Sequence, residues 1–89
     1  KILQYMNAGL AIIATDTAGQ QEVMAAAPAS GLLITAHETT EYAAKLDTLL
    51  GDHAQLRAAQ VASRAAAERE FCWERETPRL LSAVARALA

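Results

Sequence analysis

Hydrophobic and polar positions in residues 1–22 follow first a helical and then a strand-like pattern. Ile2, Leu3 and Met6 share one helical face, and Gly9 stands where a helix C-terminus favours a left-handed residue. The apolar run at residues 10–15 that follows favours a strand covered by helices on both faces. The pattern therefore predicts half of an α/β unit, with its strand in a parallel sheet.

A second helix and a second strand are expected next. Thr17 and Gln20 fit a capping box at the start of a short helix that ends near Ala26. Pro28 and the residues after it interrupt the chain, and residues 32–35 then favour a brief strand. A helix between two strands indicates a crossover connection, so we expect the two strands to lie parallel.

The remainder of the chain is expected to be helical. A helix beginning at Thr39 or Thr40 and ending at Gly51 carries one apolar stripe, formed by Tyr42, Leu46, Leu49 and Leu50. Asp52 and Gln55 fit the N-cap of a further helix. One side of this helix carries Leu56, Ala59, Ala62, Ser63 and Ala66, and its small side chains favour close packing against another helix.

The last helix is expected after Phe71 and Cys72. One of its faces is apolar and contains Trp73, Thr77, Leu80, Leu81, Val84 and Leu88. We expect Phe71 and Trp73 to anchor this helix on the sheet, and Pro78 either to kink it or to delay its start.

Three sequence blocks carry a family resemblance. The pattern K-x-x-E-Y-M-x-x-G-x-P-V-I-A-T-D-x-x-G-x-x-E-V/I is matched at Lys1, Gln4-Tyr5-Met6, Gly9, Ile12-Ile13-Ala14-Thr15-Asp16, Gly19 and Glu22-Val23. Residues 31–34 (GLLI) resemble a G-L-L-V strand, and residues 71–74 (FCWE) resemble F-S-W-E. In this order and spacing, the blocks resemble the end of the nucleotide-sugar domain of GT-B glycosyltransferases, particularly the large retaining family 4.

The resemblance implies a fold class and an extent. Residues 1–89 are expected to form the C-terminal segment of a Rossmann-like nucleotide-sugar-binding domain, with short parallel strands and a mostly helical remainder. Because the chain offers only two strand candidates, we expect the other strands of that sheet upstream of Lys1, in a longer protein.

Gln4 occupies the position of the second glutamate of the family's E-x7-E motif. The resemblance implies that this glutamate accepts hydrogen bonds from the ribose hydroxyls of the donor. A glutamine oxygen accepts such bonds more weakly than a carboxylate, and the alternative is an amide facing solvent. Lys1 matches the lysine of the family's K-x-x-E pattern and would offset the charge of a diphosphate, or else is simply solvated.

Asp16 and Thr17 follow the first strand, at the end of a sheet where ligands bind in open α/β folds. Their alternative role is to cap the following helix. Glu22 matches the glutamate of G-x-x-E, although a carboxylate near a helix N-terminus also stabilises the helix dipole. Donor binding therefore has candidates at these positions, whereas no catalytic residue is expected within this segment.

Charge and composition limit the classes of partner that we expect this chain to bind. A net charge of −2, with acidic and basic residues interspersed, favours neither nucleic acid nor an anionic membrane surface. No apolar run approaches the roughly 20 residues that span a bilayer. A single cysteine excludes an intrachain disulfide framework, and we expect a cytoplasmic protein. His37 and His53 are isolated, so a metal site is not expected. The resemblance implies that no metal is required, and no cofactor is expected, since the nucleotide-sugar donor is a substrate.

The sequence thus predicts part of a glycosyltransferase that transfers a glycosyl group from a nucleotide-sugar donor to an acceptor. The acceptor is expected on an N-terminal domain of the parent protein, and the segment alone is expected to be inactive. Two alternatives stay open: a non-catalytic interaction or assembly module, suggested by Gln4 and Ala11 in place of the family's glutamate and proline, and a GT-B sugar-nucleotide 2-epimerase.

Overall fold

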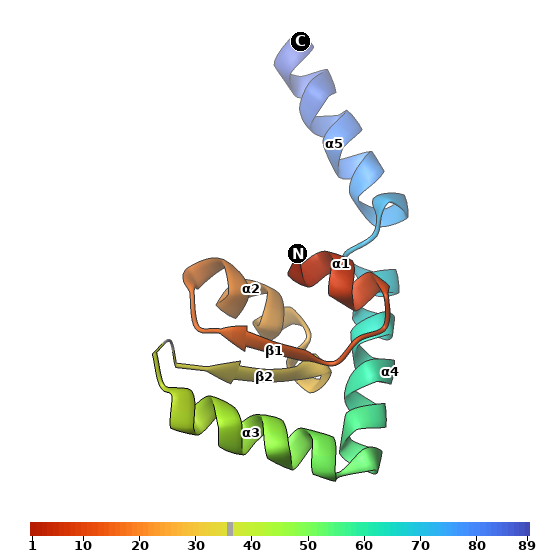
Figure 1. Cartoon of the computed structure of the whole chain (residues 1–89). Coiled ribbons are helices and arrows are strands. Elements are labelled where there is room, and N and C mark those ends of the chain that lie inside the picture. The colour runs from red at the N-terminus through yellow and green to blue at the C-terminus, as the bar shows by residue number, and fades with distance from the viewer. Residues whose placement is uncertain (36) are drawn as a thin grey trace.

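The computed structural model describes residues 1–35 and 37–89 and shows a mostly helical α/β chain with two short parallel strands (Figure 1). In chain order, the elements are α1 (Ile2–Asn7), β1 (Ile12–Thr15), α2 (Ala18–Ala26), the 3₁₀ turn Pro28–Ser30, β2 (Gly31–Ile34), α3 (Thr39–Gly51), α4 (His53–Arg69) and α5 (Trp73–Leu88). The expected order of helices and strands is confirmed. No helix in the part that the structure describes is both long and apolar enough to cross a membrane.

Gly9 ends α1 as its position predicts. It has a φ of 73°, its N–H donates to the Met6 carbonyl, and the N–H of Leu10 donates to the Tyr5 carbonyl. This pair of bonds is a Schellman motif, which satisfies carbonyls that the end of a helix leaves without partners. Because Leu10 belongs to this motif, the strand begins at Ile12 and not at residue 10.

The two strands pair in parallel, with Ile12 opposite Gly31 and Thr15 opposite Ile34. The N–H of Asp16 continues the ladder and donates to the Ile34 carbonyl at 3.0 Å. Gly31 lies very close to β1, since a Cβ built on it would be 1.7 Å from the Ile12 carbonyl oxygen. This contact requires glycine at the first position of β2.

The capping box predicted for α2 does not form. Thr17 is the N-cap residue, but its side chain makes no capping hydrogen bond. Gln20 lies beside the Thr15 hydroxyl instead, with 3.4 Å between Oγ1 and Oε1, and the neighbouring Gln21 amide donates to the Asp16 carbonyl at 2.7 Å. The side chain of Gln21 therefore turns back to the loop in place of the predicted pair.

The N-cap of α4 forms as predicted, directly after the end of α3. The carboxylate of Asp52 accepts a hydrogen bond from the Gln55 N–H at 3.0 Å. The apolar stripe on α3 is only partly used, because Leu49 is buried while Tyr42 and Leu50 are exposed. Lys45 on the same helix donates to the Leu33 carbonyl at 3.0 Å, so α3 is fixed to β2 by a polar contact as well.

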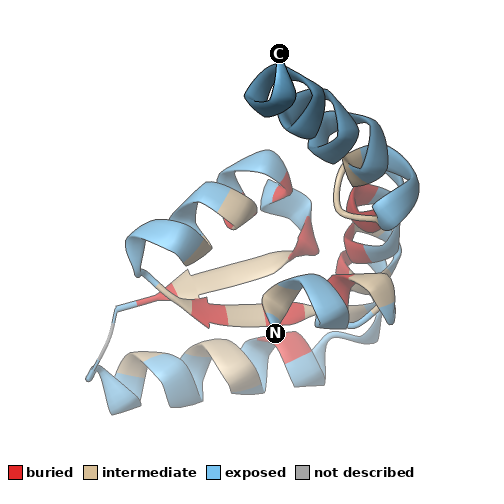
Figure 2. Ribbon diagram, turned by 90° about the horizontal axis from the view of Figure 1, so that it is seen from above, coloured by how far each residue is buried: buried red, intermediate tan, exposed pale blue. Residues whose placement is uncertain are grey.

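The core lies where the sheet, α1, α2 and α4 meet. Met6, Ile12 and Met24 are its larger buried side chains, and Phe71 packs against them. α4 contributes small buried residues, and the predicted close-packing face is confirmed at Ala59, Ser63 and Ala66. Ala67 is also buried, although it was not predicted, while Leu56 and Ala62 are only partly buried. Figure 2 shows the buried positions concentrated around the strands and along α4.

The last helix, α5, projects away from the rest of the molecule (Figure 1). All of its residues except Glu76 are exposed, among them Trp73 at 72% and Leu88 at 82%. The radius of gyration is 15.5 Å, whereas a compact chain of this length would have one of about 12 Å. The expectation that Trp73 anchors this helix on the sheet is therefore wrong, although its neighbour Phe71 does reach the core.

Pro78 neither starts α5 late nor interrupts it. The helix begins at Trp73, with Cys72 as its N-cap, and continues past Pro78 to Leu88. Because proline lacks an N–H, it fits best in the first turn of a helix, where an amide hydrogen has no intrahelical partner. Pro78 lies beyond that turn, so α5 lacks one hydrogen bond of its ladder.

Candidate functional site

A groove lies between α1 and the start of α5. Its volume is about 650 Å³, within the range of small-molecule sites. α1 and the beginning of α5 supply its walls, and Phe71 joins them. The groove is lined by Leu3, Gln4, Asn7, Phe71, Cys72, Trp73, Glu74 and Glu76.

Asn7 holds the two sides of this groove together. Its Nδ2 donates to the Leu3 carbonyl at 2.9 Å within α1 and to the Phe71 carbonyl at 2.8 Å across the groove. The backbone carbonyl of Asn7 in turn accepts a hydrogen bond from Arg64 of α4. The C-terminal end of α1 is therefore tied to α4 and to the segment that leads into α5.

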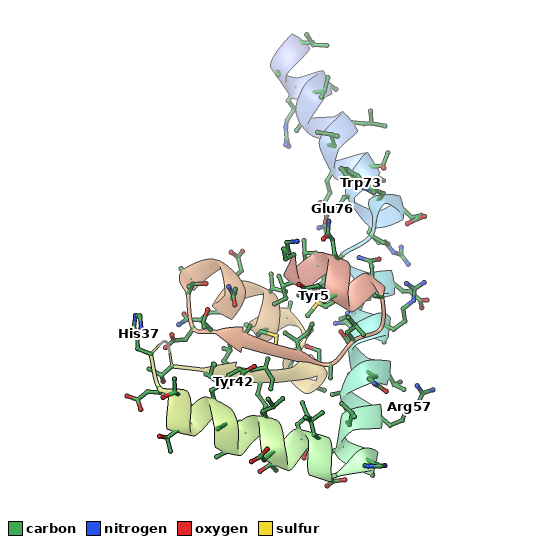
Figure 3. The ribbon with its side chains drawn as sticks, viewed as in Figure 1. Tyr5, His37, Tyr42, Arg57, Trp73 and Glu76 are labelled. Carbon is green, nitrogen blue, oxygen red and sulfur yellow. The ribbon has the colours of Figure 1, made fainter. Side chains whose placement is uncertain are left out.

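The first turn of α5 contributes carboxylates to the groove. An interaction with its own backbone N–H, followed by one with Cys72, lowers the pKa of Glu74 below its usual value. Glu76 is paired with Arg79, with 2.8 Å between Oε1 and Nη1. Figure 3 shows Trp73 and Glu76 at the end of α5 nearest to α1. Both carboxylates can accept further hydrogen bonds from a ligand.

Of the residues predicted to bind a donor, Gln4 alone lines this groove. Lys1 is the exposed N-cap of α1, one helical turn before Gln4. Asp16 and Thr17 are exposed at the carboxyl end of β1, and Glu22 is exposed on α2. None of these four lines this groove, the cavity at the strand ends or the groove between α1 and α4, so their donor-binding roles stay predictions.

A smaller cavity lies at the carboxyl ends of both strands. It measures about 140 Å³ and is lined by Thr15, Ile34, Thr35, His37, Glu38, Thr39 and Tyr42. Ligands bind at this end of open α/β sheets, but the volume is below the 300 Å³ or so of a typical ligand site. His37 and Tyr42 were not predicted here, because the sequence did not show how α3 returns to the strand ends.

A third groove, of about 590 Å³, lies where α1 meets α4. Arg57, Gln60 and Arg64 line it from α4 at helical spacing, and Gly9 lies opposite. Arg64 is paired with Glu68 at 3.0 Å, whereas Arg57 has no ion-pair partner among residues 1–35 and 37–89. This groove was not predicted from the sequence, because no pattern showed that α1 packs beside this face of α4.

The described residues contain no group of three or more histidine, cysteine, aspartate or glutamate side chains that could hold a metal ion. His37 and His53 are both exposed. Comparison of the chain with protein-family models, with curated proteins and with solved structures found no match. Family membership therefore rests on the sequence resemblance and is a proposal.

Proposed function

We propose that this chain forms the C-terminal segment of the nucleotide-sugar-binding domain of a GT-B glycosyltransferase. The parent protein would transfer a glycosyl group from a nucleotide-sugar donor to an acceptor held by an N-terminal domain. The observation that carries the proposal is that Gln4, at the motif position for ribose recognition, lines a groove of about 650 Å³. That volume suits a nucleoside.

The local structure around Gln4 supports the same proposal. The helix that carries Gln4 ends in a Schellman motif at Gly9, and β1, α2 and β2 follow in the order that the resemblance implies. Two parallel strands joined by a helix are the repeating unit of doubly wound nucleotide-binding sheets. The proposal thus has support from a motif position and from the connectivity around it.

In this proposal, the residues of the segment bind the donor and do not react with it. The Gln4 amide oxygen accepts hydrogen bonds from ribose hydroxyls, and Lys1, one turn earlier on α1, offsets diphosphate charge. Asp16, Thr17 and Glu22 would contact the donor from the carboxyl end of β1. The segment alone is expected to be inactive, because glycosyl transfer also needs the acceptor side of the cleft. A cytoplasmic location stays a prediction.

Calorimetric titration of the full-length protein with UDP, GDP and ADP tests this function. We expect micromolar binding of one nucleotide and about five- to tenfold weaker binding after Gln4→Ala, the effect of losing roughly one hydrogen bond. Gln55→Ala is the matched control, since Gln55 is an exposed glutamine on α4 outside this groove. Absence of binding to every nucleotide would contradict the proposal and favour the non-catalytic assembly module.

A further inference from the structure

We infer that Glu76 and Trp73 of α5 belong to the same ligand site as Gln4, and that Glu76 supplies the carboxylate for the vicinal hydroxyls of a nucleoside. This inference rests on the proposed function and adds residues that the motif does not contain. It also gives the first turns of α5 a role in binding.

The spacing of the lining residues supports this assignment. Gln4 and Asn7 are separated by one turn of α1, and Trp73 and Glu76 by one turn of α5, and both pairs line the groove. Residues three positions apart lie on the same face of a helix. Each of the two helices therefore contributes one pair of side chains to the groove. The Asn7 side chain is already hydrogen-bonded to the Phe71 carbonyl.

The chemistry of the lining residues selects the kind of ligand. The groove is lined by aromatic side chains, two amides and two carboxylates, and no lysine or arginine is among its lining residues. Amide and carboxylate oxygens accept hydrogen bonds from hydroxyl groups, whereas a phosphate needs donors or cations. The groove thus fits the uncharged base and sugar of a nucleotide, and the phosphates would lie outside it.

Glu76 is suited to the hydroxyl contact. Its Oε1 is held by Arg79 at 2.8 Å, which limits the freedom of the side chain. An ionised carboxylate accepts several hydrogen bonds, so the group retains capacity for a pair of hydroxyls. At the motif position, Gln4 offers a neutral acceptor, and a charged acceptor on the facing helix strengthens recognition of the same diol.

Trp73 is suited to the base. Its side chain is 72% exposed although it lines the groove, so a large aromatic surface is available to a ligand. Nucleobases stack on aromatic side chains of this kind in many nucleic-acid-binding proteins. Phe71, which is partly buried against the core, contributes the apolar wall beside it.

The experiment compares each ribonucleotide that binds with its 2′,3′-dideoxy analogue, by calorimetry on the full-length protein. Glu76→Gln is expected to weaken ribonucleotide binding about fivefold or more while leaving dideoxynucleotide binding unchanged, because the lost contact is to the missing hydroxyls. Trp73→Ala is expected to weaken both ligands about fivefold or more, and Trp73→Phe to restore most of the affinity.

Asp47→Asn is the control for loss of an exposed carboxylate, and Leu88→Ala the control for loss of an exposed apolar side chain on α5. Neither variant is expected to change binding. If wild-type protein binds a nucleotide while Glu76→Gln and Trp73→Ala bind it equally well, this inference is overturned and the proposed function survives. If Glu76→Gln weakens both ligands equally, the diol contact is overturned. If wild-type protein binds no nucleotide, the proposed function itself fails.

Discussion

The side-chain amide of Asn7 donates a hydrogen bond of 2.8 Å to the carbonyl oxygen of Phe71, 64 positions later in the chain. The same Nδ2 donates to the Leu3 carbonyl at 2.9 Å, and Arg64 donates to the Asn7 carbonyl. One short side chain therefore links α1 to the segment that carries α5. Asn7 thus connects the helix that carries Gln4 to the segment that leads into Trp73.

Asn7→Ala is expected to lower the stability of the fold and to loosen the connection between the two sides of the groove. The variant leaves the part-buried Phe71 carbonyl without its donor, which costs about 1–2 kcal/mol of unfolding free energy. Urea denaturation followed by circular dichroism measures this loss. Gln21→Ala is the matched control, because the Gln21 amide also donates to a backbone carbonyl, but only to the nearby Asp16. Equal stability losses in the two variants would contradict the linking role of Asn7.

Gly31→Ala is expected to disrupt the sheet. The added Cβ would lie 1.7 Å from the Ile12 carbonyl oxygen, and backbone atoms cannot move aside as a flexible side chain can. We expect a loss of about 3 kcal/mol or more of unfolding free energy, measured by urea denaturation. Gly19→Ala is the control, since no atom lies within 4 Å of its added Cβ. That variant is expected to be stabilised by up to about 1 kcal/mol. Wild-type stability of Gly31→Ala would rule out the close approach of the strands.

Local chemistry explains which elements could be predicted from the sequence. Gly9 marks the end of α1 because few other residues adopt a φ of 73° without strain. Asp52 marks the start of α4 because its carboxylate reaches an N–H only three residues later. Both signals act within one helical turn. The capping box predicted for Thr17 and Gln20 also depends on residues within one helical turn, but it does not form. The side chains of Gln20 and Gln21 instead lie near other polar groups of the loop.

Positions that depend on distant contacts could not be predicted. An apolar stripe on α5 indicates an amphipathic helix but does not say what covers it, and Trp73 is exposed. The groove is lined by Asn7 and Phe71, which are joined by a hydrogen bond although they lie 64 positions apart in the sequence. Gln4 was found by motif position, whereas Glu76 lies in no motif and becomes a candidate only when α1 and α5 are seen together (Figure 3).

Ser63→Ala and Ser30→Ala are expected to have opposite effects. Both serines are fully buried, but Ser30 donates to the Ala27 carbonyl at 2.7 Å, whereas the Ser63 hydroxyl has no partner among the described residues. Ser30→Ala should therefore cost about 1 kcal/mol, and Ser63→Ala should be neutral or stabilising by up to about 1 kcal/mol. Thermal unfolding of the two variants side by side measures the difference. A clear loss of stability in Ser63→Ala would indicate that its hydroxyl has a partner.

Glu41 gives the fold a dependence on acid pH. A hydrogen bond from Lys45, with 2.8 Å between Nζ and Oε1, lowers the pKa of Glu41 below its usual value. Since the pKa is lower in the folded state, the pair stabilises the fold above the ordinary glutamate pKa, and this contribution is lost as the pH falls through the lowered value. NMR titration of the Glu41 carboxyl carbon is expected to show the lowered pKa in the wild type and a return toward normal in Lys45→Met. High salt should reduce the shift, because the pair is partly exposed to solvent. An identical titration in both proteins would exclude Lys45 as the cause.

Removal of residues 78–89 is expected to leave the stability of the remaining chain nearly unchanged. None of these residues is buried, and the apolar side chains Leu80, Leu81 and Val84 face solvent. Their deletion therefore removes no core packing, and we expect an unfolding free energy within about 0.5 kcal/mol of the wild type, the range of surface changes away from special features. Urea denaturation followed by circular dichroism is the measurement.

Removal of residues 71–89 is the informative comparison, because it also deletes Phe71 and its contact with Asn7. The longer deletion should lower the unfolding free energy several times more than the shorter one. If the shorter deletion proved as damaging as the longer one, α5 would have to pack against the rest of the chain in solution. The groove between α1 and α5 would then have a volume smaller than about 650 Å³.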